Sequence, residues 1–286
     1  MTTQPTPAGE LIVCGWERVF LLELSTGETA WNWRADDQPS IPAGRREQFK
    51  TTDECKPVGS DRILITSSTN GVALVRRQAG EPVFQTTVPN AHSAEMLPGE
   101  RLAVASSHAE GGDRLVVFDL DRPGEPVCED RLSWAHGAVW DAERGLLWAL
   151  GADELRAYRL CGWETDSPSL SRAEALQLPS GGGHDLSAVP HSPLLIVTVQ
   201  EGVYQFHRDR RTFTPDPRLG NERGVKCVAV HPDTGRIAYV QAEGGHWWAE
   251  RIRLLDPDGV LHVPGEHFYK VRWAPTGPRS DSAGAG

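Results

Sequence analysis

The segment that decides the fold is residues 269–275, which read YKVRWAP. It has the form of a buried strand and is similar to residues 226–232 (KCVAVHP), which open a four-strand unit earlier in the chain. At the other end, residues 10–16 (ELIVCGW) already have the form of a second strand, so the first unit lacks its opening strand. A surplus strand at one end therefore matches a missing strand at the other.

Between these ends the chain repeats one unit: an opening strand, an apolar strand, a second apolar strand and an edge strand. Helical periodicity is almost absent, and short runs of Val, Ile, Leu and aromatic residues alternate with Gly, Pro and Asp turns, as is typical of all-β proteins. Second strands are predicted at 10–16, 63–68, 101–107, 145–151, 194–200 and 236–242, and third strands at 18–24, 71–77, 114–120, 154–160, 202–208 and 250–256. Six units spaced about 40–50 residues apart predict four-stranded propeller blades.

We therefore predict an all-β fold, a six-bladed β-propeller over residues 10–276, whose ring closes when the last strand pairs with the N-terminal three. Closure removes the unpaired strand edges that an open sheet exposes. Two stacked β-sandwiches are the alternative, but they explain neither the regular repeat nor the matched ends. Residues 1–9 are predicted to be an N-terminal tail, and the small, polar residues 277–286 a disordered C-terminal tail.

Composition and charge narrow the classes of partner. The 286-residue chain has 29 Lys and Arg against 39 Asp and Glu, a net charge of −10, which argues against nucleic acid and anionic membranes as partners. We expect no secretory signal and no membrane span, because no basic start precedes an apolar core and no apolar run is long enough. Five scattered cysteines without a CxxC pair indicate free thiols and a cytoplasmic location. No Gly-rich phosphate loop is present, so no nucleotide cofactor is expected.

Two parts of the sequence resemble known propellers. Residues 22–33 (LELSTGETAWNW) resemble the D-x-x-T-G-x-x-x-W unit of quinoprotein-type repeats, with Glu23 in place of Asp. This implies an outer-strand Trp packed between blades, but no quinone. Nearly the whole chain is similar to a bacterial family of six-bladed propellers of unknown function. The residues that carry this similarity are 53–56 (DECK), 91–93 (AHS), 135–137 (AHG) and 183–185 (GHD). It implies the fold and leaves the chemistry open.

Each opening strand is the innermost of its blade, so the residues at its start are expected to meet at one mouth of the central channel. Unit by unit, these residues are Asp53 or Glu54, His92, His136, His184, Lys226 and Tyr269. Three histidines at equivalent places predict a metal site, because neutral imidazoles from neighbouring blades can hold Zn, Mn, Fe or Ni. Asp53 or Glu54 would be a fourth ligand or would orient a ligating histidine. The placement resembles that in the seven-bladed oligogalacturonate lyases, although no motif is shared. The alternative is that these polar residues only solvate the channel mouth.

The loops between second and third strands are expected on the same face as this mouth. Two are long, residues 106–113 (SSHAEGGD) and 242–250 (AEGGHWWAE). Exposed aromatic residues beside glycines suit stacking against a sugar or another planar ligand, and packing between blades is the alternative. The predicted substrate-binding residues are Glu17, His108, Arg223, His246 and Trp247.

The sequence thus predicts a metal-dependent enzyme of lyase, epimerase or hydrolase type that acts on a small polar or sugar-like molecule. A divalent transition metal would act as a Lewis acid. Lys226, Tyr269 or Lys56 would serve as base or acid, with a pKa lowered by burial or by the metal. The alternative is a non-catalytic propeller that binds a ligand or a protein.

Overall fold

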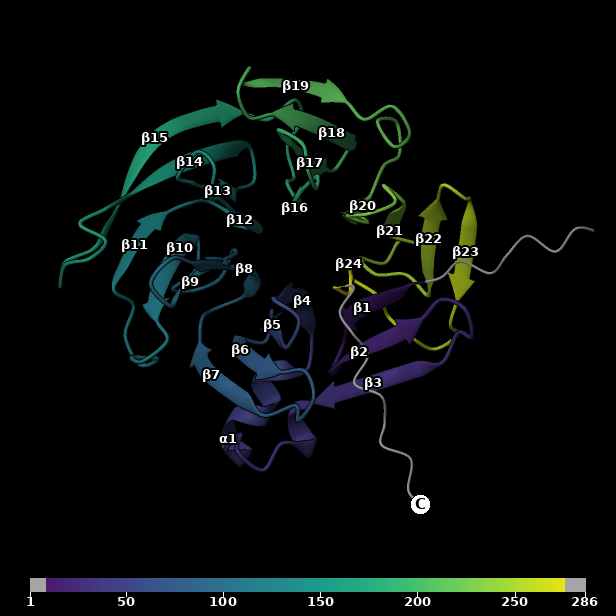
Figure 1. Cartoon of the computed structure of the whole chain (residues 1–286), viewed down its shortest axis with the longest axis horizontal. Coiled ribbons are helices and arrows are strands. Elements are labelled where there is room, and N and C mark those ends of the chain that lie inside the picture. Colours follow the sequence, from purple (N-terminus) through teal and green to yellow (C-terminus); the bar gives the residue numbers. More distant parts are fainter. Residues whose placement is uncertain (1–8, 276–286) are drawn as a thin grey trace, which may run out of the picture.

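Six four-stranded antiparallel sheets stand around a central axis in the computed structural model, which describes residues 9–275 (Figure 1). The predicted six-bladed propeller is therefore confirmed. The sheet of blade one contains both β24 and β1–β3, so the ring closes as predicted by pairing the two ends of the chain. The predicted tails, residues 1–9 and 277–286, lie outside the described residues apart from Gly9.

Each blade runs from an innermost strand to an outer edge strand. The innermost strands are β4 (Thr52–Val58), β8 (Ala91–Leu97), β12 (Gly137–Asp141), β16 (Asp185–Ala188), β20 (Val225–Val230) and β24 (Lys270–Trp273). The second strands are β5 (Arg62–Ser67), β9 (Arg101–Ser106), β13 (Leu146–Leu150), β17 (Leu194–Val199), β21 (Ile237–Gln241) and β1 (Glu10–Gly15). The third strands are β6 (Gly71–Arg76), β10 (Arg114–Asp119), β14 (Glu154–Cys161), β18 (Gly202–His207), β22 (Arg251–Leu255) and β2 (Arg18–Glu23). The edge strands are β7 (Pro82–Thr87), β11 (Cys128–Arg131), β15 (Ser169–Gln177), β19 (Thr212–Pro215), β23 (Gly259–His262) and β3 (Thr29–Arg34).

Burial explains why these segments form blades. The second and third strands are almost continuously apolar and buried, as in β5 and β6, because both of their faces pack against neighbouring blades. The edge strands alternate between exposed and half-buried residues, as in β15. The hydrophobic clusters mix residues of adjacent blades, so the core consists of the layers between the sheets.

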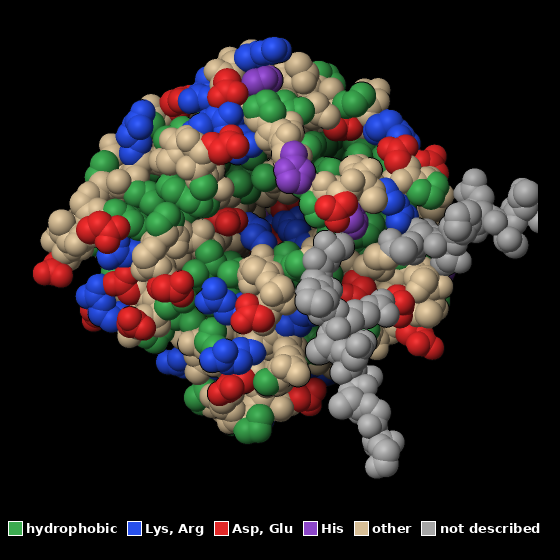
Figure 2. Space-filling view, viewed as in Figure 1, with side chains coloured by type: hydrophobic (Ala, Val, Ile, Leu, Met, Phe, Trp, Pro, Cys, Tyr) green, Lys and Arg blue, Asp and Glu red, His purple; other side chains and the backbone are tan. Residues whose placement is uncertain are grey.

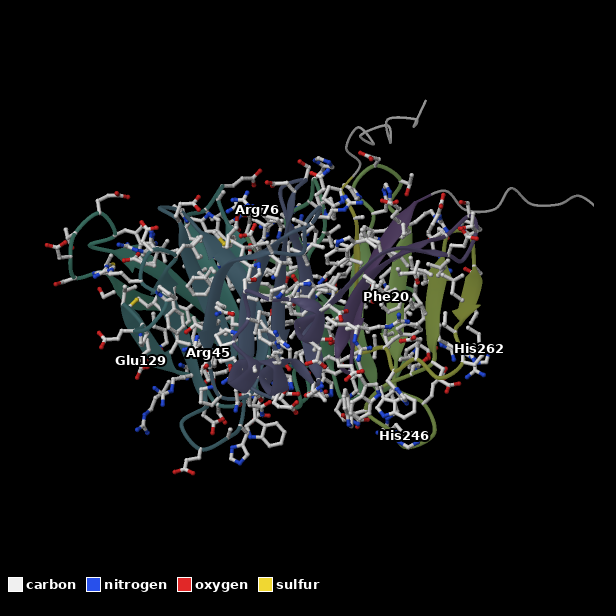
Figure 3. The ribbon with its side chains drawn as sticks, turned by 90° about the horizontal axis from the view of Figure 1, so that it is seen from below. Phe20, Arg45, Arg76, Glu129, His246 and His262 are labelled. Atoms are coloured by element: carbon white, nitrogen blue, oxygen red, sulfur yellow. The ribbon has the colours of Figure 1, made fainter. Side chains whose placement is uncertain are left out.

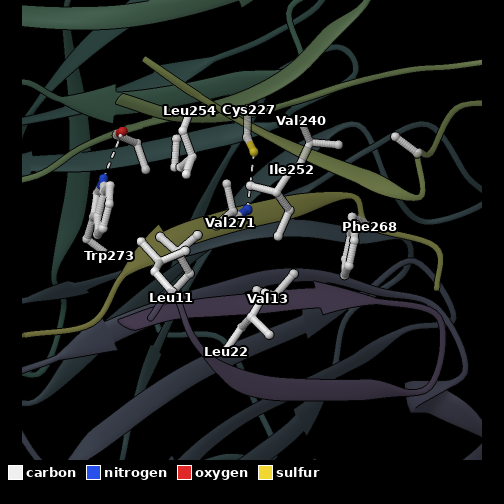
Figure 4. Close-up of a cluster of buried hydrophobic side chains, with 14 of the residues drawn as sticks. Leu11, Val13, Leu22, Cys227, Val240, Ile252, Leu254, Phe268, Val271 and Trp273 are labelled. Atoms are coloured by element: carbon white, nitrogen blue, oxygen red, sulfur yellow. Dashed lines mark hydrogen bonds between the residues drawn. The ribbon is translucent and has the colours of Figure 1, made fainter. Parts of the chain in front are cut away.

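Closure of the ring is secured by side chains as well as by strand pairing. β24 pairs with β1 and also packs against blade six (Figure 4). The indole Nε1–H of Trp273 donates to the carbonyl of Ala229 at 3.1 Å, and the amide of Val271 donates to Sγ of Cys227 at 3.2 Å. The last strand is therefore tied to β1 of its own blade and to β20 of blade six.

The connection from blade one to blade two contains the helical turns of the described residues: η1 (Ala35–Asp37), α1 (Ala43–Arg46) and η2 (Glu47–Phe49). None of these helices is long and apolar enough to cross a membrane. Trp31, the Trp of the quinoprotein-like repeat, is half-buried against the apolar cluster between blades one and two. Trp33, two residues further on, is fully buried in that cluster, where its Nε1–H donates to the carbonyl of Gly80 at 2.9 Å. The five cysteines are all free.

Candidate functional site

Every inner strand opens with a β-bulge or with an off-register hydrogen bond, and in each blade this irregularity falls at the residue of the channel mouth. In three blades the strand register skips one residue; the skipped residues are Asp53, His92 and Lys226. In the other three blades, the amide of the mouth residue donates to the carbonyl of the residue that stands opposite its successor in the strand pair. These bonds run from His136 to Leu150, from His184 to Thr198 and from Tyr269 to Cys14. Bulges re-aim side chains, often beside functional sites. Here they turn one side chain from each blade toward the axis.

These six side chains line one cavity of about 280 Å³, together with Ser68 and Trp247. We call Asp53, His92, His136, His184, Lys226 and Tyr269 the mouth ring. Figure 3 views the propeller from its side and shows His246, next to Trp247 in the chain, at one face and Arg76 at the other. The sequence left open whether Asp53 or Glu54 takes part, and Asp53 is the residue that lines the cavity.

The three histidines form a continuous row of rings. The ring centroids of His92 and His136 are 4.2 Å apart, and those of His136 and His184 are 5.9 Å apart. Nδ1 of His92 lies 3.2 Å from the carbonyl of Asn90, and Nδ1 of His136 lies 2.8 Å from that of Trp134. A carbonyl only accepts hydrogen bonds, so in both rings Nδ1 carries the proton and Nε2 keeps its lone pair.

Burial keeps the three imidazoles uncharged. It lowers the pKa of His92 to about 3 and that of His184 to about 4, and it lowers the pKa of His136 well below its usual value. The cations Lys226 and Lys270 act in the same direction on His184. At neutral pH the row therefore presents neutral rings that can accept a proton or a hydrogen bond.

Asp53 and Lys226 are the mouth-ring groups whose pKa lies closest to neutrality. Burial raises the pKa of Asp53 to about 7, although the amide of Ser68 donates to its carboxylate. Burial lowers the pKa of Lys226 to about 8. The ammonium of Lys226 lies 3.2 Å from Nε2 of His184, and no carboxylate among the described residues forms an ion pair with it. Tyr269 is buried, which raises its pKa well above the usual value. The cavity thus holds a carboxyl and an amine that can both exchange protons near pH 7.

A buried ion network crosses the channel next to the mouth ring, where the ammonium of Lys270 donates to the carbonyls of His92 and His136. Arg272 donates to the carboxylates of Glu54 and Asp185, from blades two and five, at 2.6–3.0 Å. The ammonium of Lys270 lies 3.1 Å from Asp185 and 3.6 Å from Glu54. Burial alone would raise the pKa of Glu54, but Arg272 and Lys270 hold it well below its usual range. Figure 2 shows the centre of the ring as a hollow that contains Lys and Arg side chains.

This network accounts for two predicted site residues that do not line the cavity. Glu54, a candidate metal ligand, bonds to Arg272 and to the hydroxyl of Ser93. Lys56, a candidate acid or base, donates to Glu95 at 2.7 Å and to the carbonyls of Ala94 and Ala138. Lys270, Arg272 and Asp185 were not among the residues predicted from the sequence. They could have been found from the charged residues that interrupt the innermost strands, which read KVRW in β24 and DLSA in β16.

Of the predicted rim residues, Trp247 lines the cavity and the other four do not. Glu17 is paired with Arg34 beside a second cavity. His108 pairs with Asp113 and stacks on Trp134, and His246 stacks on Trp248. Arg223 is exposed and paired with Glu201. The long loops therefore lie at the rim, and they contribute one side chain, Trp247, to the cavity.

The fit of a metal to the mouth ring can be judged from its nitrogen atoms. Nε2 of His92 and His136 has the lone pair that a ligand needs, whereas Nε2 of His184 lies 3.2 Å from Lys226 and 3.3 Å from the amide oxygen of Gln200. Nδ1 of His184 is buried and has no hydrogen-bond partner among the described residues. Within residues 9–275, no group of three or more His, Cys, Asp or Glu side chains is arranged to hold a metal ion. The ring as it stands does not fit a three-histidine centre.

Residues 15–277 match the model of a family of unknown function, DUF6528. The match spans all six blades, so the chain belongs to that family. The predicted membership of a family of six-bladed propellers without an assigned function is consistent with this match.

Proposed function

We propose that the mouth ring is the active site of an enzyme that transfers protons on a small polar substrate, as lyases and epimerases do. The observation that carries the proposal is convergence: the start of the inner strand of each of the six blades contributes one side chain to a single cavity, and these side chains are a carboxyl, three imidazoles, an amine and a phenol. Residues that only solvate a channel mouth need not be titratable in every blade, nor buried.

Lys226 and Asp53 are the proposed base and acid pair. An amine with a pKa of about 8 is partly unprotonated near neutral pH, and a carboxyl with a pKa of about 7 is partly protonated. They come from blades six and two, which flank blade one, and both line the same cavity, so a substrate in that cavity can meet both. The neutral imidazoles of His92, His136 and His184 would hydrogen-bond the substrate's oxygen atoms.

Exchange of substrate protons with solvent tests this proposal. The protein is incubated in D₂O with panels of small hydroxy acids, sugars and sugar acids, and NMR follows deuterium incorporation and product formation. We expect Lys226→Met to abolish exchange and Arg122→Met, which removes an exposed cation paired with Asp119 outside the cavity, to preserve it. Exchange that persists unchanged in Lys226→Met overturns the proposal, and so does the absence of any exchange across the panels.

Although the ring as it stands does not fit a three-histidine centre, a divalent transition metal bound by the histidines stays a prediction from the sequence, and no step proposed above passes through it. Its test is metal analysis of protein purified without a histidine tag. Near-stoichiometric Zn, Mn, Fe or Ni that is lost in the His92→Ala/His136→Ala variant would support it. Unchanged thermal stability in a chelator, with no metal found, would contradict it.

A non-catalytic binding protein is the second candidate, and the exposed ring of Trp247 favours it. Trp247 is 40% exposed and lies against Tyr269, with ring centroids 5.5 Å apart. In that case Trp247→Ala would abolish ligand binding, whereas loss of Lys226 would leave binding intact. A small polar or sugar-like partner, no nucleic acid, no membrane and a cytoplasmic location remain predictions in either case.

A further inference from the structure

We propose that a second cavity, adjacent to the mouth ring, extends the site, and that the substrate is a neutral carbohydrate chain whose end unit enters the mouth ring. We call this second space the side cavity. It has a volume of about 530 Å³ and is lined by the β1–β2 turn (15–18), Arg34, Lys50, Thr51 and residues 265–267. This inference rests on the proposed function of the mouth ring.

The two cavities share one wall. Thr51 lines the side cavity, and Asp53, two residues further along, lines the cavity of the mouth ring. The hydroxyl of Ser68, which also lines the mouth ring, donates to the hydroxyl of Thr51 at 2.9 Å. A ligand that leaves the mouth ring over this wall therefore enters the side cavity directly.

Two indole rings bridge the cavities. Trp247 lines the cavity of the mouth ring, and Trp16 lines the side cavity. The centroids of the two indoles are 5.7 Å apart. Both rings are substantially exposed, at 40% and 38%. Trp16 also has a φ of +50°, which is uncommon for an aromatic residue and holds its ring in the tight β1–β2 turn. Exposed indoles with a polar edge suit ligands that combine an apolar face with hydroxyl groups.

The charges of the side cavity identify the class of ligand. Each cation there already has a carboxylate partner: Arg18 pairs with Glu266, and Arg34 and Lys50 both pair with Glu17. Paired cations offer little to a phosphate-rich polymer, and the net charge of −10 opposes one. Ion pairs also make a poor lining for an apolar molecule. Donors and acceptors side by side, next to an indole face, match the hydroxyl groups and ring faces of a neutral sugar.

The size of the two spaces suits more than one sugar unit. The mouth ring cavity of about 280 Å³ is close to the lower limit of small-molecule sites, which span roughly 300–1,000 Å³. The side cavity, at about 530 Å³, is larger. One unit in the first and the next units in the second would also cover the Trp247–Trp16 bridge between them.

Binding of defined neutral sugars tests the inference. Monosaccharides and their di- to tetrasaccharides, with glucose, galactose, mannose or xylose units, are titrated into the full chain by calorimetry. We expect an oligosaccharide to bind to the protein at least about tenfold more tightly than the monosaccharide from which it is built. Trp16→Ala should remove that gain and leave monosaccharide binding unchanged. Trp134→Ala is the matched control, because Trp134 is 49% exposed with a φ of +49° and lines neither cavity.

Trp16→Phe covers the case in which the Ala variant fails to fold, because it keeps a flat ring and should lose only part of the gain. The inference is overturned if oligosaccharides bind no more tightly than monosaccharides, or if no sugar binds at all. In either case, proton exchange on other molecules that depends on Lys226 would leave the proposed function standing. Tight, Trp16-dependent chain binding with exchange unaffected by Lys226→Met would instead support the side cavity and overturn the proposed function.

Discussion

Lys226 carries a stability cost that a purely structural lysine would not carry. Its pKa falls to about 8 in the folded protein, from 10.5 in the unfolded chain, because its ammonium is buried. Between these two pH values the unfolded chain binds more protons, so the free energy of unfolding rises with pH across that window. At pH 7 the folded protein therefore holds a charge in an unfavourable place.

The expected result is that Lys226→Met raises the free energy of unfolding at pH 7 by about 1–3 kcal/mol. The gain should shrink as the pH rises from 8 to 10.5, where the wild-type lysine loses its charge. Urea denaturation at a series of pH values measures it. Lys50→Met is the control, because that ammonium lies at the rim, paired with Asp36, and little gain is expected there. A destabilised Lys226→Met protein would contradict the argument.

At this scale the sequence predicted which residues reach the mouth but not what each one contacts. The repeat aligned all six mouth-ring positions, because a propeller repeats the same station in every blade. It could not separate Asp53 from Glu54, because a shift of one residue changes the direction of a side chain. Nor could it reveal that Glu54 bonds to Arg272, 218 residues away, because ion pairs across the channel leave no pattern in sequence spacing.

At the scale of elements, the start of each inner strand decides where the site lies, and in blade four that start needs a glycine because the next blade lies close to it. Gly137 follows His136 and lies directly against Leu186 of blade five. A Cβ added there would lie 2.6 Å from Cβ of Leu186 and 3.1 Å from its backbone nitrogen. The backbone of Leu186 would have to move, and Leu186 directly follows His184 and Asp185 in the chain.

We expect Gly137→Ala to lower the free energy of unfolding by about 1–3 kcal/mol, the cost of overpacking a close contact. It should also reduce any activity of the mouth ring, although it changes no charged or polar group. Gly124→Ala is the matched control, since no atom of residues 9–275 other than its chain neighbours lies within 4 Å of its added Cβ. Equal unfolding midpoints in urea for the two variants would show that the close approach of the blades does not matter.

Strand positions and ring closure could be predicted because each strand is a short apolar run bounded by turn residues, which can be recognised in the sequence of that strand alone. The deficit at residues 10–16 and the surplus at 269–275 led directly to the pairing of β1 with β24. The bulges were not open to prediction, because an extra residue in a ladder is defined only once its partner strand is known. The rim was predicted as a set of loops, and the structure selects Trp247 from them because the other side chains find partners elsewhere.

Across the whole molecule, Arg272 joins three blades at the axis. It belongs to β24 of blade one and bonds to Glu54 of blade two and Asp185 of blade five. The buried network balances two carboxylates against the two cations Lys270 and Arg272. Its value lies in holding opposite sides of the ring in one register, since a buried ion pair is not in itself more stabilising than apolar packing.

Removing one member of this network should therefore cost far more than removing a surface ion pair. Arg272→Met leaves two buried carboxylates with one cation, and we expect it to lose about 3–5 kcal/mol of unfolding free energy in urea. Arg223→Met, which removes an exposed pair with Glu201, should change little. Adding Glu54→Gln to Arg272→Met restores the charge balance and should recover part of the loss. An Arg272→Met protein as stable as Arg223→Met would mean that the blades keep their register through apolar packing alone, and the mouth ring would then not depend on the charges beneath it.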